Sequence, residues 1–266
     1  MHPASLLRQA GLKPYPLEAL SGGEIGQVWR AGPYVVKTHP SPPPGLFQAE
    51  ARGLWALAQA GVRVPRVYWA SEAGLVLEYL PPGPPDWEGL ARMLATLHRQ
   101  PAPTYGWDGP VFLGSFALPG GTSSSWPHFW AEKRIQPLLE AAWPQLGAMG
   151  PKVESLLAEP LPQEGPALLH GDLWQGNVLH TQEGPALLDP SAWWGERAVD
   201  LAMMRLFGGF PDTFWTIYQA LHPLPLEVAQ ALPRYQVYYL LVHVYLFGSS
   251  YLPMLDRVLR TTDGFG

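Results

Sequence analysis

The chain has 266 residues, of which 47% are hydrophobic and 15% charged, and it contains 28 glycines and 31 prolines. This composition excludes a disordered tail and a collagen-like chain, and the length allows one large domain or two modest ones. The formal net charge is −5 and the basic residues are scattered. No broad cationic surface is therefore expected, which argues against nucleic acid or an anionic membrane as the main partner.

Cysteine is absent from the sequence. Disulfides, thiolate nucleophiles and iron–sulfur clusters are excluded with it, in keeping with a reducing compartment. The longest apolar stretch, Val237 to Gly248, is interrupted by His243 and falls well short of the roughly 20 residues that a membrane helix needs. The N-terminus lacks the apolar core of a signal peptide. We therefore expect a cytoplasmic protein.

The first 80 residues predict a small β-rich unit. Gly22, Gly23 and Gly26 stand at the front of the run S-G-G-E-I-G-Q-V-W-R, and Tyr34 to Lys37 follows after a Gly-Pro turn. Both runs predict strands. A helix is then predicted over 47–60 and two further strands over 65–69 and 75–80.

A proline-rich segment, P-P-G-P-P over 81–85, interrupts the chain. Such a segment can continue neither a strand nor a helix. We place a boundary there, which predicts an N-terminal lobe over 1–80, a hinge over 81–85 and a C-terminal lobe over 86–266.

The C-terminal lobe is predicted to be mostly helical. Apolar residues recur at helical spacing over 87–100, 126–143, 199–207, 212–221, 226–245 and 251–260. The Gly/Pro/Ser-rich stretch 101–125 is read as a loop, and short strands are expected at 167–169 and 186–188. The aromatic residues of 235–247 are expected to form core rather than a ligand pocket.

The strongest functional signal is H-G-D-L-W-Q-G-N over 170–177, followed by L-L-D-P over 187–190. Phosphoryl transfer from ATP needs a carboxylate that accepts the proton of the attacking hydroxyl, and oxygen ligands for Mg²⁺. Asp172 is the candidate catalytic carboxylate, and Asn177 and Asp189 are the candidate metal ligands, at the spacing typical of kinases. The alternative is an ordinary polar turn between two strands.

A kinase also needs a lysine on the phosphates, a helix glutamate that pairs with it, and a glycine-rich lid. Lys37 at the end of a predicted strand and Glu50 in the next helix fit the first two roles. Gly22 and Gly23 fit the lid. Taken singly, each has a simpler explanation as a surface charge or a hairpin turn. Their order upstream of Asp172 is the order of the parts in kinases, and this favours the kinase assignment.

These motifs, with D-L-A-M-M-R-L-F-G-G-F-P over 200–211 and E-A-R-G-L over 50–54, resemble the fructosamine kinase (ketosamine-3-kinase) family, a branch of the aminoglycoside phosphotransferase-like group. The resemblance covers most of the chain. It implies an α+β, two-lobe protein-kinase-like fold with ATP and Mg²⁺ between the lobes. It also implies transfer of the γ-phosphate to the 3-hydroxyl of a ketosamine, free or protein-bound, which makes the adduct unstable and reverses glycation.

The resemblance carries roles to individual positions. Asp172 would be the base, Asn177 and Asp189 the Mg²⁺ ligands, and Lys37 with Glu50 the pair that positions the phosphates.

Further roles follow for the nucleotide and the acceptor. Glu78, Tyr79 and Leu80 would meet adenine through their backbone. Trp174 would pack against the sugar, with core packing as the alternative.

Two neighbours of the loop complete the expected site. His170 would brace the catalytic loop. Asp200 would serve either as the N-terminal carboxylate of a helix or as a second brace for this loop.

Two segments depart from the family pattern. Where the family shows G-H-R-E-A-D, this chain has G-E-R-A-V-D over 195–200, so Glu196 replaces a histidine and Ala198 a glutamate. The segment 121–125 is G-T-S-S-S and lacks the family's asparagine. Both departures put the details of substrate recognition in doubt, although they leave phosphoryl transfer untouched.

Other functions stay open. The chain could be a kinase of another small hydroxylated amine, such as an aminoglycoside, choline, homoserine or methylthioribose, or a nucleotide-binding scaffold without turnover. A transition-metal hydrolase built on His170, Asp172, His180 and Asp189 has little support, because His180 falls in a strand beyond the loop. The serines of 123–125 lack the G-x-S-x-G context of a hydrolase.

Overall fold

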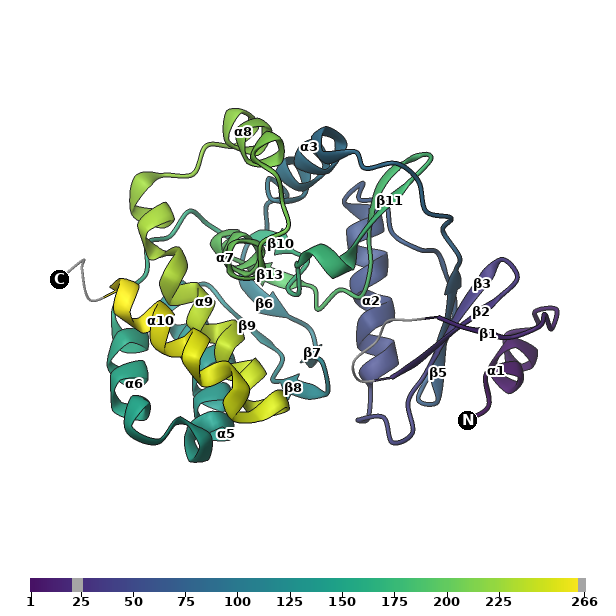
Figure 1. Cartoon of the computed structure of the whole chain (residues 1–266), viewed down its shortest axis with the longest axis horizontal. Coiled ribbons are helices and arrows are strands. Elements are labelled where there is room, and N and C mark those ends of the chain that lie inside the picture. The colour runs from purple at the N-terminus through teal and green to yellow at the C-terminus, as the bar shows by residue number, and fades with distance from the viewer. Residues whose placement is uncertain (21–25, 263–266) are drawn as a thin grey trace.

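A computed structural model describes residues 1–20 and 26–262. Figure 1 shows a β-rich N-terminal part and a larger helical part side by side. The N-terminal part holds helices α1 (Pro3–Gln9) and α2 (Leu46–Gln59). Its strands are β1 (Glu18–Ala19), β2 (Gln27–Ala31), β3 (Tyr34–Thr38), β4 (Val67–Ser71) and β5 (Gly74–Glu78).

The five strands form one antiparallel sheet in the order β1-β2-β3-β5-β4. Successive side chains of β5 point to opposite faces of the sheet, and each face has its own hydrophobic core. Val76 packs with Leu6 and Leu7 of α1 on one face, whereas Leu75 and Leu77 pack with residues of α2 on the other. The predicted strands and the helix after β3 are confirmed. The short helix α1 was not predicted, because its seven residues are too few to show a helical period.

The segment between β5 and α3 (Trp87–Leu97) is bonded to the helical part rather than free. The Gly83 amide donates to the carbonyl of His180 at 2.7 Å, and the Asp86 amide donates to His180 Nδ1 at 2.9 Å. Pro82 forms an isolated antiparallel β-bridge with Thr181, which lies in the hairpin of β11 (Val178–Thr181) and β12 (Gly184–Leu187). The proline-rich segment is therefore anchored to this hairpin, and the lobe boundary at 81–85 stays a prediction.

The helical part contains most of the remaining chain. Its α-helices after α3 are α4 (Trp126–Trp130), α5 (Gln136–Leu146), α6 (Gly150–Ala158), α7 (Ala198–Phe207), α8 (Asp212–Leu221), α9 (Leu226–Phe247) and α10 (Leu252–Thr262). The other strands are β6 (Tyr105–Trp107), β7 (Val111–Leu113), β8 (Phe116–Leu118), β9 (Gly121–Ser123), β10 (Ala167–Leu169) and β13 (Trp193–Gly195). Strands β10-β13-β6-β9 form a second sheet, and β7–β8 is a separate hairpin.

One prediction for this part was wrong. The stretch 101–125 is not a loop, since it holds β6 to β9; each of these strands has only three residues, which is too short to show an alternation. The helix expected over 126–143 is present as a continuous helical stretch over 126–146 that contains a π-helical turn over 131–135, and α6 was missed. The other helices after residue 198 lie within two residues of their predicted bounds.

Helix α9 lies at the centre of the main hydrophobic core, where Tyr235, Tyr238 and Leu240 are fully buried. Within the described residues, no helix has both the length and the apolar character that crossing a membrane would require.

Candidate active site

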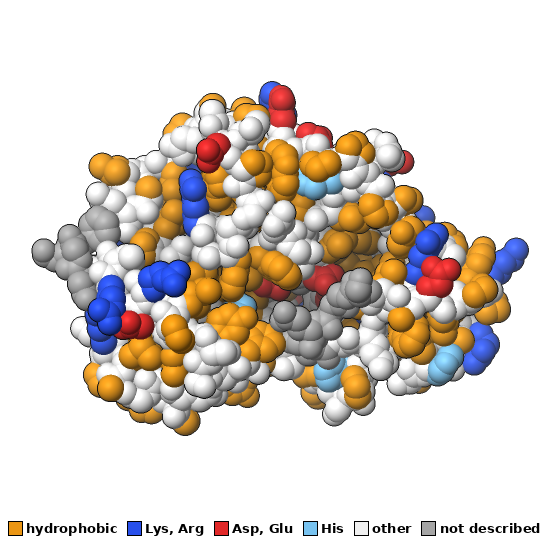
Figure 2. All heavy atoms as spheres, in the orientation of Figure 1, with side chains coloured by type: hydrophobic (Ala, Val, Ile, Leu, Met, Phe, Trp, Pro, Cys, Tyr) orange, Lys and Arg blue, Asp and Glu red, His pale blue; other side chains and the backbone are white. Residues whose placement is uncertain are grey.

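A cavity of about 830 Å³ lies between the first sheet and the helical part. Every predicted site residue that the structure describes lines it: Lys37, Glu50, Glu78, Tyr79, Leu80, Asp172, Trp174, Asn177 and Asp189. Gly22 and Gly23 lie outside the described residues. Figure 2 shows acidic side chains inside a hollow on this face of the molecule. We call this space the larger cavity.

Lys37 is held between two carboxylates in the larger cavity. Its Nζ lies 2.6 Å from Oε1 of Glu50 and 2.6 Å from Oδ1 of Asp189. Burial lowers the pKa of Lys37, but the charges of Asp189 and Glu50 outweigh it, so that the pKa lies above its usual value. The amine therefore stays protonated at any physiological pH. Strand β3, helix α2 and the end of β12 each contribute one member of this cluster.

Asp189 adopts a left-handed backbone conformation, with φ of 54°, and among the described residues it is the non-glycine with positive φ. Such a conformation costs an ordinary residue about 1–2 kcal/mol, and strain of this kind gathers at functional sites. Gly53 of α2 lets the helix approach this segment, because a Cβ there would lie 3.2 Å from Pro190 and 3.3 Å from Ala192. Helix α2, which carries Glu50, therefore packs closely on the residues that follow Asp189.

The segment 170–177, which we call the catalytic loop after the role expected for Asp172, is anchored by Asp200 of α7. The two carboxylate oxygens of Asp200 accept the amides of His170 and Gly171, each at 2.8 Å. His98 Nε2 lies 3.2 Å from the same carboxylate. Of the two roles considered for Asp200, the geometry is that of a brace for the loop.

His170 ties this loop to the segment that carries Asp189. Its Nε2 donates to the carbonyl of Leu188 at 2.8 Å, and its Nδ1 accepts the Asp172 amide at 3.3 Å. Burial lowers the pKa of His170, although Asp200 and Asp189 oppose the shift. The imidazole is therefore neutral near pH 7, as this pair of hydrogen bonds requires. The expected bracing role matches the geometry.

Asn177 contacts Asp172 from the other end of the loop. Its Nδ2 donates to the backbone oxygen of Asp172 at 2.8 Å and to the carboxylate oxygen Oδ2 at 3.3 Å. The amide nitrogen is thereby engaged, and the amide oxygen is the remaining polar atom of this side chain. Together with the Asp189 carboxylate, it offers the hard oxygen donors that Mg²⁺ prefers. The donor chemistry at these positions fits this ion.

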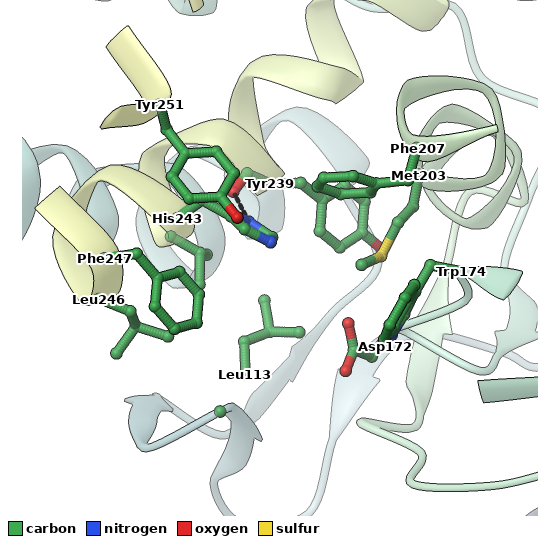
Figure 3. A pocket seen from close by; sticks show the side chains of 12 residues that line it. Leu113, Asp172, Trp174, Met203, Phe207, Tyr239, His243, Leu246, Phe247 and Tyr251 are labelled. Atoms are coloured by element: carbon green, nitrogen blue, oxygen red, sulfur yellow. Dashed lines mark hydrogen bonds between the residues drawn. The ribbon is translucent and has the colours of Figure 1, made fainter. Parts of the chain in front are cut away.

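A second cavity, of about 180 Å³, opens on the other side of Asp172. We call it the smaller cavity. It is lined by Leu113, Gly114, Asp172, Trp174, Met203, Phe207, Tyr239, Val242, His243, Leu246, Phe247 and Tyr251. Figure 3 shows Asp172 and Trp174 on one wall and Phe247 and Tyr251 on the facing wall.

Asp172 and Trp174 line both cavities. The Trp174 side chain is not core, because 40% of the residue is exposed. Asp172 can therefore reach a group bound in either cavity, and the geometry favours ligand contact for Trp174 over the packing alternative.

Sequence reasoning missed most of the smaller cavity. Met203 and Phe207 come from α7, and Tyr239, His243 and Phe247 from α9. The expectation that the aromatic residues of 235–247 form core is wrong for His243 and Phe247, whereas Tyr239 belongs to the core and also lines the cavity. Apolar spacing marks one side of a helix as buried, but it does not tell a packed neighbour from a cavity wall.

The glycines after Phe207 have a packing reason. Gly209 has φ of 86°, and a Cβ there would lie 2.1 Å from Oε1 of Gln175 in the catalytic loop. The L-F-G-G segment therefore packs against the loop and carries Phe207. This motif was the sequence signal that could have predicted part of the smaller cavity.

Glu196, which stands where the family has a histidine, has a structural role. Its carboxylate accepts the Tyr105 hydroxyl at 2.6 Å and the Glu164 amide at 2.9 Å, and only 1% of the residue is exposed. Burial raises the pKa of Glu196, while these hydrogen bonds oppose the shift. Neither Glu196 nor Ala198 lines the larger or the smaller cavity, and the same holds for the serines of 123–125. The doubt that these substitutions cast on substrate recognition finds no support in the geometry.

The backbone near the end of β5 is partly used by the sheet. The Glu78 amide donates to Arg66 and the Tyr79 amide to Pro33, both at 2.8 Å. The ring of Tyr79 lies 4.2 Å from the guanidinium carbon of Arg30. In the backbone stretch expected to meet adenine, the amides of Glu78 and Tyr79 are therefore already occupied.

His180 does not join Asp172 and Asp189. Its Nδ1 accepts the Asp86 amide, and its ring packs on Trp87 at 4.5 Å between centroids. This arrangement contradicts the transition-metal cluster considered from the sequence.

Comparison with known proteins agrees with this geometry. A family model described as fructosamine kinase matches residues 4–262. The chain belongs to the fructosamine kinase family. A probable ketoamine kinase of Thermus thermophilus is 61% identical over 98% of this chain and 100% of its own length. A probable ketoamine kinase of Escherichia coli is 36% identical over 90% of this chain and 91% of its own.

Solved structures extend the likeness to the fold. A Thermobifida fusca protein that carries the provisional name fructosamine-3-kinase superposes with a TM-score of 0.87 at 31% identity, covering 98% of both chains. An aminoglycoside phosphotransferase superposes with a TM-score of 0.63 at 16% identity, covering 99% of this chain and 100% of its own. This family member therefore has the expected α+β, two-lobe protein-kinase-like fold.

Proposed function

We propose that this fructosamine kinase family member transfers the γ-phosphate of ATP to the 3-hydroxyl of a ketosamine. The observation that carries the proposal is the position of Asp172 between two cavities, one with a lysine–carboxylate cluster and one with aromatic walls. A carboxylate that touches both spaces can accept a hydroxyl proton on one side while the phosphate lies on the other.

The larger cavity supports ATP. Protonated Lys37, oriented by Glu50, would contact the phosphates. Leu80 lines the cavity beside the two occupied amides, so its own amide is the proposed donor to the adenine base. The positions of Gly22 and Gly23 upstream keep them as the proposed phosphate lid.

Asn177 and Asp189 are the proposed ligands of Mg²⁺. When bound, this ion would neutralise the charge that develops on the phosphate oxygens. Asp189 now pairs with Lys37 at 2.6 Å, so the same carboxylate orients the lysine. Asn177 also keeps the Asp172 carboxylate in place through its amide nitrogen.

The smaller cavity supports a ketosamine as the acceptor. Trp174 and the other aromatic faces suit the C–H faces of a sugar, and they also attract the protonated amine of such an adduct. Asp172 is the acidic residue among those that line this cavity. A polycation such as an aminoglycoside would need several carboxylates, and the described walls offer this one only.

Transfer forms a bond between O3 of the sugar and the γ-phosphorus, and breaks the bond between that phosphorus and the ADP oxygen. The hydroxyl proton passes to Asp172. A phosphate on C3, next to the C2 carbonyl, is a good leaving group for elimination. Elimination and hydrolysis would release the amine, a sugar-derived dicarbonyl and inorganic phosphate, which is the basis of the proposed deglycating role.

An ATP-consumption assay with Mg²⁺ tests this function. We expect turnover with fructose-lysine or ribulose-lysine and little with kanamycin, choline, homoserine or methylthioribose. Turnover with one of the latter would keep the kinase and change its acceptor. Failure with every acceptor, with ATP still bound, would favour the nucleotide-binding scaffold.

A further inference from the structure

Tyr239 of α9 contacts both the smaller cavity and the catalytic loop. Its ring is part of the cavity wall, and only 1% of the residue is exposed. Figure 3 shows Tyr239 on the cavity wall next to Met203 and Phe207. A molecule that fills the cavity would touch the same side chain that reaches the loop.

The hydroxyl of Tyr239 donates to the carbonyl of Gly171 at 3.0 Å. On the other side of Gly171, its amide donates to Asp200 at 2.8 Å. Gly171 has φ of 79°, and a Cβ there would lie 2.0 Å from the carbonyl oxygen of Ser191. The residue directly before Asp172 is thus fixed at its amide by α7, at its carbonyl by α9, and by close packing.

Tyr238, the preceding residue, provides a natural contrast. It is fully buried, and its hydroxyl has no hydrogen-bond partner among the described residues. Burial raises the pKa of both tyrosines, and the charges of Asp172 and Asp200 add to the shift in each. The two phenols therefore share burial and electrostatic surroundings. They differ in the hydrogen bond to the catalytic loop.

We propose that the Tyr239 hydroxyl is a positioning group for the Asp172 carboxylate. It fixes the peptide bond between Gly171 and Asp172 relative to the wall on which the acceptor rests. The proposal rests on the proposed role of Asp172 as the base. Tyr239 acts on the reaction through this peptide bond, while its ring contributes separately to the shape of the cavity.

The test compares Tyr239→Phe with Tyr238→Phe and the original chain. Each variant keeps the ring and removes one hydroxyl. We expect Tyr239→Phe to lower kcat about tenfold, the order expected for one lost hydrogen bond and a displaced catalytic group, with KM for ATP and acceptor within about twofold. Tyr238→Phe should leave kcat unchanged, since it removes a hydroxyl without a partner.

Hydrogen exchange of the free protein provides a second readout that needs no acceptor. Amides of residues 170–174 should exchange several-fold faster in Tyr239→Phe than in Tyr238→Phe, whereas the melting temperatures of both variants should stay close to the original. Equal exchange in the two variants would overturn the proposal whether or not a ketosamine is the acceptor. Equal kcat values would overturn it too. Faster exchange without any ketosamine turnover would reject the proposed function and keep the positioning role.

Discussion

At the scale of single residues, the larger cavity contains two pairs of contacting side chains. Lys37 and Asp189 are 152 positions apart and lie 2.6 Å from each other. Asp172 and Asn177, five positions apart, form the other pair. The side chains of Lys37 and Glu50 are mostly buried, whereas that of Asp189 is 44% exposed, and removal of one member changes the charge balance of the whole cluster.

Asp172→Ala tests the role of the base. We expect kcat to fall by about three orders of magnitude, because no group accepts the hydroxyl proton, while ATP binds almost as before. Steady-state kinetics and nucleotide titration measure the two quantities. Asp108→Ala, at an exposed position outside both cavities, is the control. Turnover of Asp172→Ala close to that of the control would reject the assignment.

Lys37→Met tests the cluster. It leaves Glu50, whose side chain is 15% exposed, without its cation, and we expect a loss of about 2–3 kcal/mol in the free energy of unfolding. Affinity for ATP should also fall at least tenfold. The double variant Lys37→Met/Glu50→Gln should regain part of the stability but none of the affinity. Denaturant melts and titration calorimetry give both values, and equal stability of the single and double variants would contradict the account.

At the scale of elements, the proline-rich segment after β5 and the hairpin β11–β12 act together. Gly83 lies so close to the hairpin that a Cβ would be 2.4 Å from the carbonyl carbon of Thr181. The backbone at Gly83 cannot move away easily, because the Gly83 amide donates to the His180 carbonyl at 2.7 Å. The segment that borders the larger cavity is therefore positioned by a strand from the other part of the chain.

Gly83→Ala should disturb this contact. We expect a lower melting temperature and weaker ATP binding, because the segment must move away from the hairpin. Gly150→Ala is a suitable control, since the three nearest atoms to its new Cβ would belong to the ring of Trp143, which is 42% exposed and can shift. Thermal melts with and without ATP compare the two variants. The same melting temperature for both would show that the contact carries little weight.

Much of the site could be predicted at these two scales. Asp172, Asn177, Asp189, Lys37 and Glu50 were found because their residue types and order are dictated by phosphoryl transfer chemistry. The cavity walls on α7 and α9 could not be predicted, because their residues read as ordinary apolar helix faces. The strands of 101–125 were missed because three-residue strands owe their existence to sheet partners that lie far away in the sequence.

At the scale of the whole molecule, a partly buried histidine, His222, makes the stability depend on pH. The pKa of His222 is lowered to about 4 by burial and by the charge of Arg197, with smaller contributions from His98 and Arg99. The folded protein therefore binds fewer protons than the unfolded chain between pH 6.5 and about 4. The stability that depends on neutral His222 is present above pH 6.5 and is lost as the pH falls through this window.

His222→Gln should reduce this loss. We expect the variant to gain melting temperature relative to the original chain as the pH falls from 7 to 5, because the group that resists protonation is gone. His128→Gln, which changes an exposed histidine, is the control. Melting curves across this range measure the difference. Parallel pH profiles for all three proteins would contradict the assigned shift.

The central claim, transfer of phosphate from ATP to the 3-hydroxyl of a ketosamine, is tested most directly by ³¹P NMR of the protein with Mg²⁺, ATP and fructose-lysine or ribulose-lysine. We predict a new phosphomonoester signal coupled to the proton on C3, followed by its decay to inorganic phosphate with release of free lysine. A phosphomonoester on another hydroxyl, or a signal that forms only with an aminoglycoside or choline, would contradict the account.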